Sequence, residues 1–248
     1  MAAEANHKIS KGRIEQLWAL LKSLKAGNEF NQKDQTPRDE DLCTINEALT
    51  HTSAKSKLNH ERLEFLGDAV LRLAASEFID WKFPNMHVGE RSALRAQLVS
   101  DKWLSQIGKR ISIKDFLLIG PQAAGDASAL TTLEAEATEA LIGAIYESSL
   151  GMEFIHGWLT PYWEETSTDV LQDPYKYNSK SALQELSQKI GIQLPTYLNK
   201  ELSKRHGDPM RFFSKVELDG KPMGEGWGSS RREAEQAAAH QTLLTLNK

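Results

Sequence analysis

Apolar residues recur at helical spacing over the first two thirds of the chain. The first apolar face is formed by Ile14, Leu17, Trp18 and Leu21, in a helix that we expect to end near Gly27. Residues 28–42 are polar and predict a loop, and helical periodicity then dominates from about residue 43 to residue 167. Breaks are expected at Pro84, Gly120, Pro121, Gly125 and Gly151. Because no strand-like alternation occurs here, the first domain is predicted to be all-α.

The pattern changes after a turn-rich segment that contains Asp173 and Pro174. A helix from Ser179 to about Gly191 is followed by three strand-like stretches and by a helix from Ser230 to the end. This order predicts a small α+β module (α-β-β-β-α). We therefore predict a multidomain chain: an all-α domain at residues 10–167, a linker at 168–177 and an α+β domain at 178–248.

Charge is distributed unevenly between the two predicted domains. Residues 178–248 contain 11 Lys and Arg against 8 Asp and Glu, hence +3, so the rest of the chain carries −7 within the total of −4. A polyanionic partner would be held mainly by the C-terminal domain, while the acidic domain needs cations to approach phosphates.

The cysteine content and the hydropathy of the chain restrict the cellular compartment that we expect for the protein. The single cysteine, Cys43, excludes a disulfide framework and favours a reducing cytoplasm. No stretch is long and apolar enough to span a membrane, and no signal-peptide core is present at the N-terminus. The cysteine and histidine residues show no zinc-ligand spacing, and His87, His156 and His240 are interpreted as surface or packing residues.

A row of carboxylates marks the segment that begins at His60. On a helix, Glu61, Glu64 and Asp68 stand at i, i+3 and i+7 and share one narrow face. The roughly opposite face, predicted to be buried, carries Leu63, Leu66, Val70 and Leu73. Since like charges at this spacing repel, the row is either a solvated acidic face or a site for a hard cation such as Mg²⁺. Gly67 inside this helix indicates close approach of another group.

The segment His60–Leu71, H-E-R-L-E-F-L-G-D-A-V-L, closely resembles the signature helix of the ribonuclease III family, [N/H]-E-R-L-E-F-L-G-D-[S/A]-[V/I]-L. Three more blocks resemble the family in the same order: Ala48–Ser53, Leu94–Ser100 and Glu139–Tyr146. In the C-terminal module, Lys180–Glu185 and Gly224–Ala238 resemble the first helix and the ending of a double-stranded RNA-binding domain. The resemblance implies an all-α ribonuclease III endonuclease domain followed by an α+β double-stranded RNA-binding domain.

The resemblance also implies an activity: Mg²⁺-assisted hydrolysis of phosphodiesters in double-stranded RNA, leaving 5′-phosphate ends and 3′ overhangs, in the processing of ribosomal RNA precursors, messenger RNA or regulatory duplexes. The implied catalytic residues are Glu61, Glu64, Asp68 and Glu139. The implied metal ligands are Glu64, Asp68, Glu136 and Glu139. Two acidic pairs on neighbouring helices would suit this chemistry, because metal ions must activate water and neutralise phosphate charge.

Two positions depart from the family pattern. Glu136 stands where the family usually has Asp, which moves the ligand oxygens by about 1 Å or more. A glutamate common in the family aligns with Val88, although Glu90 lies close by, so we expect this accessory carboxylate to be missing or displaced.

The C-terminal module is expected to bind the RNA. Ser230 can cap a helix whose N-terminus faces phosphates, and Arg231 and Arg232 add positive charge there. The remaining contacts carried over from the resemblance are Gln184 and Glu185 on the first helix and His206 in the loop between the first strands.

The remaining expectations concern the oligomeric state of the protein and whether it is an active enzyme. A homodimer would supply the second carboxylate cluster needed to cut both strands, and Phe65, apolar and beside the acidic row, is the expected anchor in a pocket of the partner. The alternatives are a double-stranded RNA-binding scaffold with a weakened nuclease site and a purely regulatory RNA-binding protein. Retention of the four catalytic carboxylates favours the enzyme.

Overall fold

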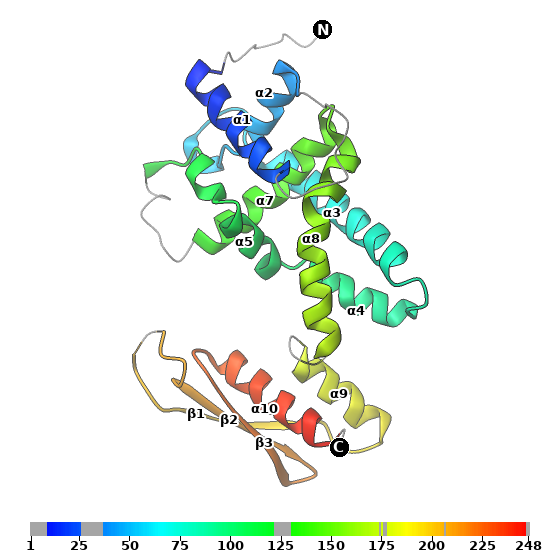
Figure 1. The fold of residues 1–248 in the computed structure, drawn as a ribbon. Helices are drawn as coiled ribbons and strands as arrows, with labels where there is room; N and C mark the ends of the chain where they lie inside the picture. The colour runs from blue at the N-terminus through cyan, green and yellow to red at the C-terminus, as the bar shows by residue number, and fades with distance from the viewer. Residues whose placement is uncertain are drawn as a thin grey trace. The chain divides into compact units, whose positions relative to one another are not determined.

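The computed structural model describes residues 9–25, 37–121, 130–173, 175, 178–205 and 207–246 of the chain. These residues divide into two compact units, residues 1–167 and 168–248. Figure 1 shows the helical unit and the unit that contains the sheet.

The N-terminal unit is helical. Its described residues contain no strand, only an isolated bridge between Thr50 and Leu118, so the predicted all-α class is confirmed. Its α-helices are α1 (Lys11–Lys25), α2 (Asp39–Ala48), α3 (Glu61–Lys82), α4 (Val88–Leu98), α5 (Asp101–Arg110), α7 (Leu130–Glu147) and α8 (Gly151–Gln172), which continues beyond the unit. Two short 3-10 helices are η1 (Thr52–Ala54) and η2 (Ile113–Phe116).

Helix α7 forms the centre of this unit. Its residues are buried around almost its whole circumference, many of them alanines, and α2, α3 and α5 pack against it. A helix that is apolar on all sides is stable only when neighbouring helices cover it. Small side chains let those neighbours come close, and the closest approach is that of α3 at Gly67 and Gly143.

The buried face of α3 differs from the predicted one at one position. Leu63 and Val70 are buried and Leu66 is half-buried, but Leu73 is 50% exposed and was wrongly placed in the core. The buried stripe instead includes Gly67, Leu71, Ala74, Ala75 and Phe78. The stripe is therefore rotated toward residues i+4 and i+8 from Leu63, where α7 lies, and Leu73 falls on the outer flank.

Two helix ends also differ from the sequence interpretation. Helix α2 starts at Asp39, inside the segment predicted as a loop, because the Asp41 carboxylate caps the first turn by accepting the backbone N–H of Arg38 at 2.8 Å. Helix α8 runs to Gln172 and covers the first five residues of the segment 168–177. Buried Trp163 and Val170 continue its apolar face beyond Pro161.

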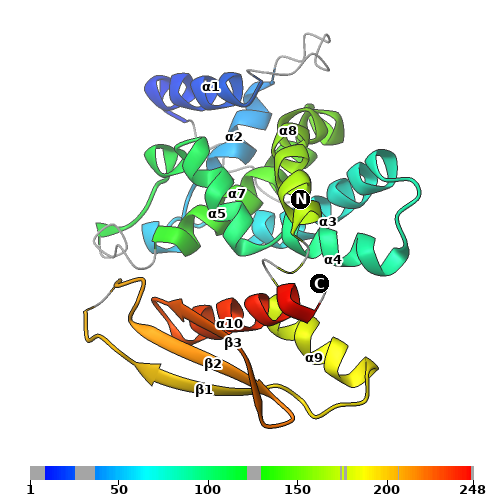
Figure 2. The same cartoon turned by 60° about the horizontal axis from the view of Figure 1, so that its bottom comes forward.

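The C-terminal unit is an α-β-β-β-α module, as predicted. Its elements are α9 (Ser179–Lys189), β1 (Thr196–Glu201), β2 (Phe212–Leu218), β3 (Lys221–Gly228) and α10 (Arg231–Leu246). The strands pair antiparallel in the order β1-β2-β3, and both helices lie on one face of the sheet (Figure 2). Leu183, Val216 and Leu243 lie in its core. Glycines of β3 allow this close packing, since a Cβ at Gly226 would lie 2.3 Å from the backbone nitrogen of Ala238.

Candidate active site

The contact between α3 and α7 brings acidic residues of both helices together. A Cβ at Gly67 would lie 1.9 Å from the carbonyl oxygen of Glu139, and a Cβ at Gly143 would lie 2.1 Å from that of Leu63. The two backbones therefore touch, which only glycine permits. Glu64 and Asp68 flank Gly67 along α3, so both carboxylates lie beside Glu139 of α7.

The electrostatics of Glu139 show how closely these carboxylates are grouped. Burial, then the charges of Asp68, Glu64 and Asp101, raise the pKa of Glu139 to about 7, and Arg72 opposes this effect. Burial and the charge of Glu136 likewise raise the pKa of Glu64. Such a group is unfavourable without a neutralising cation.

The donors of this group fit a hard divalent cation. All are carboxylate oxygens from two rigid helices, which is the ligand type that Mg²⁺ takes in proteins. Asp68 is half-exposed and pairs with Arg72 at 2.7 Å, so an arriving ion competes with one surface ion pair, which holds the carboxylate only weakly.

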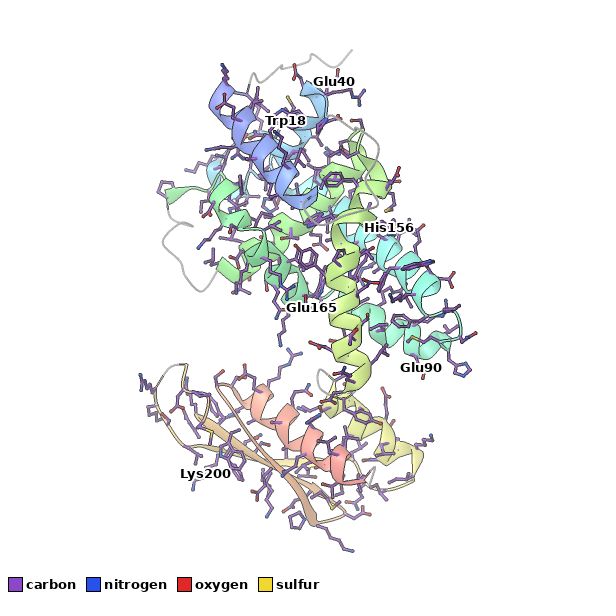
Figure 3. All side chains as sticks on the ribbon, viewed as in Figure 1. Trp18, Glu40, Glu90, His156, Glu165 and Lys200 are labelled. Atoms are coloured by element: carbon purple, nitrogen blue, oxygen red, sulfur yellow. The ribbon has the colours of Figure 1, made fainter. Side chains whose placement is uncertain are left out.

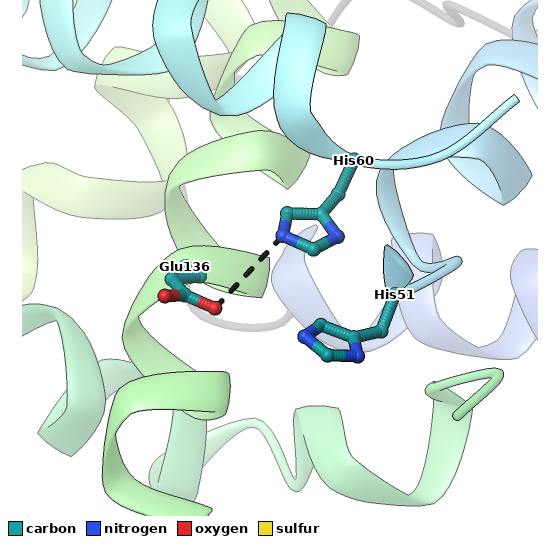
Figure 4. Close-up of side chains that lie close together, drawn as sticks. All are labelled: His51, His60 and Glu136. Atoms are coloured by element: carbon teal, nitrogen blue, oxygen red, sulfur yellow. Dashed lines mark ion pairs between the residues drawn. The ribbon is translucent and has the colours of Figure 1, made fainter. Parts of the chain in front are cut away.

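Glu136 of α7 also acts on Glu64, whose pKa its charge raises. Its Oε2 is 3.9 Å from Nε2 of His60, and the same nitrogen is 3.3 Å from Oε2 of Glu64. The His60 ring stacks on the ring of His51 with centroids 5.0 Å apart (Figure 4). Burial, then the imidazole of His60, lower the pKa of His51, whereas Glu136 and Glu61 raise it. Glu136 thus contacts a histidine pair that sequence analysis did not single out.

Glu61 stands at the exposed start of α3, where its charge raises the pKa of Glu64. The accessory carboxylate of the family was expected to be missing or displaced in this chain. Val88 is 79% exposed, and Glu90 (labelled in Figure 3) accepts the backbone N–H of His87 at 3.0 Å as a cap of α4. Asp101, at the start of α5, lies near the site instead, and its charge raises the pKa of Glu139. Its position directly after the capping residue Ser100 was the sequence feature that could have drawn attention to it.

In the C-terminal unit, the residues predicted to bind RNA lie on the surfaces of two helices. Ser230 accepts the backbone N–H of Glu233 at 3.2 Å and caps α10, and Arg231 and Arg232 are exposed in its first turn. Gln184 and Glu185 are exposed on α9. His206 lies outside the described residues.

The remaining predicted features are on the surface as well. Phe65 is 85% exposed. His156 pairs with Glu77 and His240 with Asp173, in agreement with a surface or packing role. Among the described residues, every helix is too short or too polar to cross a membrane.

Comparison with known proteins assigns the chain to a family. Residues 40–159 match the model "Ribonuclease-III-like", and residues 179–246 match "Double-stranded RNA binding motif". A protein named Ribonuclease 3 from Prochlorococcus marinus is 50% identical over 240 residues, which cover 96% of each chain. Ribonuclease 3 2 from Synechocystis is 40% identical over 229 residues, covering 92% of this chain and 91% of that one.

A solved nuclease domain of ribonuclease III from Campylobacter jejuni aligns with 62% of this chain and 92% of its own, at 31% identity and a TM-score of 0.46.

The chain thus has a helical domain in which two touching helices bring carboxylates together, and it also has a double-stranded RNA-binding domain. This combination defines a ribonuclease with a catalytic domain and an RNA-binding domain. The chain belongs to the ribonuclease III family, and its interpretation as an enzyme of that family is confirmed.

Proposed function

We propose that this protein cleaves double-stranded RNA by Mg²⁺-assisted hydrolysis in the cytoplasm, leaving 5′-phosphate ends and 3′ overhangs. Ribosomal RNA precursors, messenger RNA and regulatory duplexes are the substrates that this chemistry fits. The observation that supports the proposal is the glycine contact between α3 and α7, which brings Glu64 and Asp68 close to Glu139. Burial and the charges of these two neighbours raise the pKa of Glu139 to about 7.

The chain's own residues have distinct roles in this proposal. Glu64, Asp68 and Glu139 hold the cation, and Glu136 contributes from the side of His60. Bound Mg²⁺ supplies an activated water and neutralises charge on the phosphate. Glu61, at the exposed rim, keeps the electrostatic field negative where the cation enters. Rigid helices hold these groups, so little reorganisation is needed on binding.

Cleavage of both strands requires a second copy of the cluster, which a homodimer supplies. Phe65 is 85% exposed on α3, and Leu73 on the same outer flank is 50% exposed. A cavity of about 420 Å³ lies at the far end of α3, lined in part by Ser76, Val88 and Arg95. Two copies of α3 in antiparallel orientation would bring Phe65 of each toward this cavity of the other.

The C-terminal domain supplies most of the RNA affinity. The amide groups at the start of α10, with Arg231 and Arg232, face phosphates, while Gln184 and Glu185 on α9 reach the minor groove. His206 is a further proposed contact with the RNA. We place the domain boundaries at residues 10–167 and 178–248, with the intervening segment as the connection.

The deciding experiment separates cleavage from binding. Asp68→Asn and Glu139→Gln each remove one anionic ligand and leave the C-terminal domain unchanged, so both should abolish Mg²⁺-dependent cleavage of a perfect RNA duplex and preserve its binding. Glu153→Gln, an exposed glutamate in the first turn of α8, is the matched control and should cleave normally. An unaltered protein that binds the duplex but does not cut it with Mg²⁺ would support the scaffold instead.

A further inference from the structure

Three side chains from separate parts of the helical domain converge beside the carboxylate cluster. His51 precedes η1, His60 precedes α3 and Glu136 lies on α7. One ligand atom from each, two ring nitrogens and one carboxylate oxygen, lie within 4.8 Å of one another (Figure 4). They line a small cavity of about 10 Å³ whose other walls are apolar, among them Leu117 and Leu133. That space is close to the size needed for a single water or ion.

In each histidine ring, Nδ1 has a hydrogen-bond partner outside the group of three ligand atoms. Nδ1 of His60 lies 3.3 Å from the carbonyl oxygen of Thr50, which can only accept, so Nδ1 carries a proton, and in the neutral ring Nε2 presents a lone pair. Nδ1 of His51 lies 2.7 Å from Oγ of Ser53 and 3.1 Å from its backbone nitrogen. The backbone N–H of Ser53 donates to Nδ1, so Nδ1 is an acceptor in the metal-free protein. Metal binding through Nε2 of His51 therefore requires a change of tautomer, after which Nδ1–H can donate to Oγ of Ser53. Of the two rings, His60 is the one whose partner holds the proton on Nδ1, as in the ligating tautomer of metal-bound histidines.

The charge around these nitrogens calls for a cation. Nε2 of His60 faces two carboxylates, Glu64 at 3.3 Å and Glu136 at 3.9 Å. A bare lone pair directed at two carboxylates is unfavourable, so either a proton or a metal ion must lie between Nε2 and the carboxylates, and a metal ion could be coordinated by both kinds of group.

We propose that His51, His60 and Glu136 form a second metal site, which takes a transition-metal ion of the Zn²⁺ or Co²⁺ class. Imidazole nitrogen suits these ions, whereas Mg²⁺ prefers an all-oxygen shell such as the neighbouring cluster. Ligand distances of about 2.0–2.2 Å require the three atoms to close by roughly 1 Å, which side-chain torsions can supply. Occupancy draws Glu136 away from the Mg²⁺ ligands, so we expect the bound ion to raise the Mg²⁺ concentration needed for the proposed cleavage.

The test uses the full-length protein and Co²⁺ as the probe, because Co²⁺ held by four or five protein ligands absorbs visible light much more strongly than the aqueous ion and gives a distinct band. With Mg²⁺ in excess, the unaltered protein should bind one Co²⁺ with this band. His51→Ala and Glu136→Gln should each weaken binding by roughly tenfold or more, as expected when a metal site loses a donor. His87→Ala, an exposed histidine at the start of α4, is the matched control and should bind as the parent does.

Two further variants keep the outcome decisive. His51→Gln preserves more of the side-chain volume and should also lose the band, with circular dichroism reporting the fold of each variant. Asp68→Asn, altered in the carboxylate cluster only, should retain Co²⁺. Displacement of Co²⁺ by Mg²⁺, or undiminished binding in folded His51→Gln and Glu136→Gln, would overturn the proposal. Because binding is measured without RNA, this result is independent of whether the protein cleaves duplexes; only the expected rise in required Mg²⁺ rests on the proposed function.

Discussion

Gly67 of α3 lies directly against the backbone of Glu139 of α7, so closely that a Cβ on Gly67 would be 1.9 Å from the Glu139 carbonyl oxygen. The relationship is reciprocal, because a Cβ on Gly143 of α7 would be 2.1 Å from the carbonyl oxygen of Leu63 in α3. The distance between the carboxylates of the two helices is therefore set by backbone contact. Packing, rather than hydrogen bonding between the carboxylates, positions the proposed cation ligands.

Replacing Gly67 by Ala should separate the two helices. The added methyl meets backbone atoms that cannot move independently, so we expect a loss of about 2–3 kcal/mol or more in the free energy of unfolding. Cleavage should fall with it, because Glu139 moves away from Glu64. Urea denaturation measures the first effect. Gly89→Ala is the control, since nothing lies within 4 Å of a Cβ there, and it should be neutral or stabilising by up to about 1 kcal/mol. Equal stability of both variants would contradict this account of the contact.

Phe65→Ala should weaken the proposed homodimer. An aromatic residue buried at the centre of an interface commonly contributes about 2 kcal/mol or more, which is roughly a thirtyfold change in the dimer dissociation constant. Analytical ultracentrifugation should show the parent at twice the monomer mass of 27.8 kDa and the variant shifted toward the monomer. Leu244→Ala, which changes an exposed apolar residue of α10, should remain dimeric. A parent that sediments as a monomer at micromolar concentration would contradict the dimer itself.

Replacing Arg231 and Arg232 together by Ala should weaken RNA binding equally for all duplex sequences. Each arginine lost from a phosphate contact lowers the slope of log affinity against log salt by roughly 1, so a decrease of about 1–2 is expected. Lys221→Ala is the control: Lys221 begins β3, about 20 Å along the strand from the start of α10. An effect confined to particular sequences would mean that the arginines read bases.

The Asp41 cap should make stability depend on pH in the acid range. Burial alone raises the pKa of Asp41, but hydrogen bonds from Ser149 and Arg38 outweigh it, and the pKa lies below its usual value. A lowered pKa in the folded state stabilises the fold above the unfolded value of about 3.9 and loses this contribution as pH falls through the folded value.

Asp41→Asn should therefore cost about 2 kcal/mol at pH 7, since hydrogen bonds to a charged group are lost, and less as the pH is lowered toward 3. Thermal unfolding across this pH range measures the difference. Asp39→Asn, an exposed residue of the same helical turn, should have little effect at any pH. A constant difference between Asp41→Asn and the parent down to pH 3 would contradict the assigned ionisation.

The sequence predicted the class and order of elements well, because helical periodicity and the α-β-β-β-α order are local patterns. It also predicted the close approach at Gly67, although not which helix approaches. It could not place Leu73, since the buried stripe of α3 depends on the position of α7. It also missed the cap by Asp41, whose carboxylate accepts a further hydrogen bond from Ser149 in a distant segment. The pairing of His51 with His60 was equally inaccessible, because a spacing of nine residues matches no local ligand pattern and only the fold stacks the rings.

Glu136 offers the sharpest test of how the two metal sites share one residue. Glu136→Asp shortens the side chain by one methylene and withdraws the carboxylate from Nε2 of His60, from which it is 3.9 Å away. Cleavage with Mg²⁺ should stay similar or rise, because the family's usual side chain is restored, while Co²⁺ binding should weaken. Glu136→Gln is the matched comparison: it keeps the length but removes the charge, so apparent affinity should fall for both ions. Mg²⁺-activation curves and Co²⁺ titrations of the same preparations distinguish these outcomes. If both variants match the parent in both assays, Glu136 is a ligand at neither site and the cluster consists of Glu64, Asp68 and Glu139.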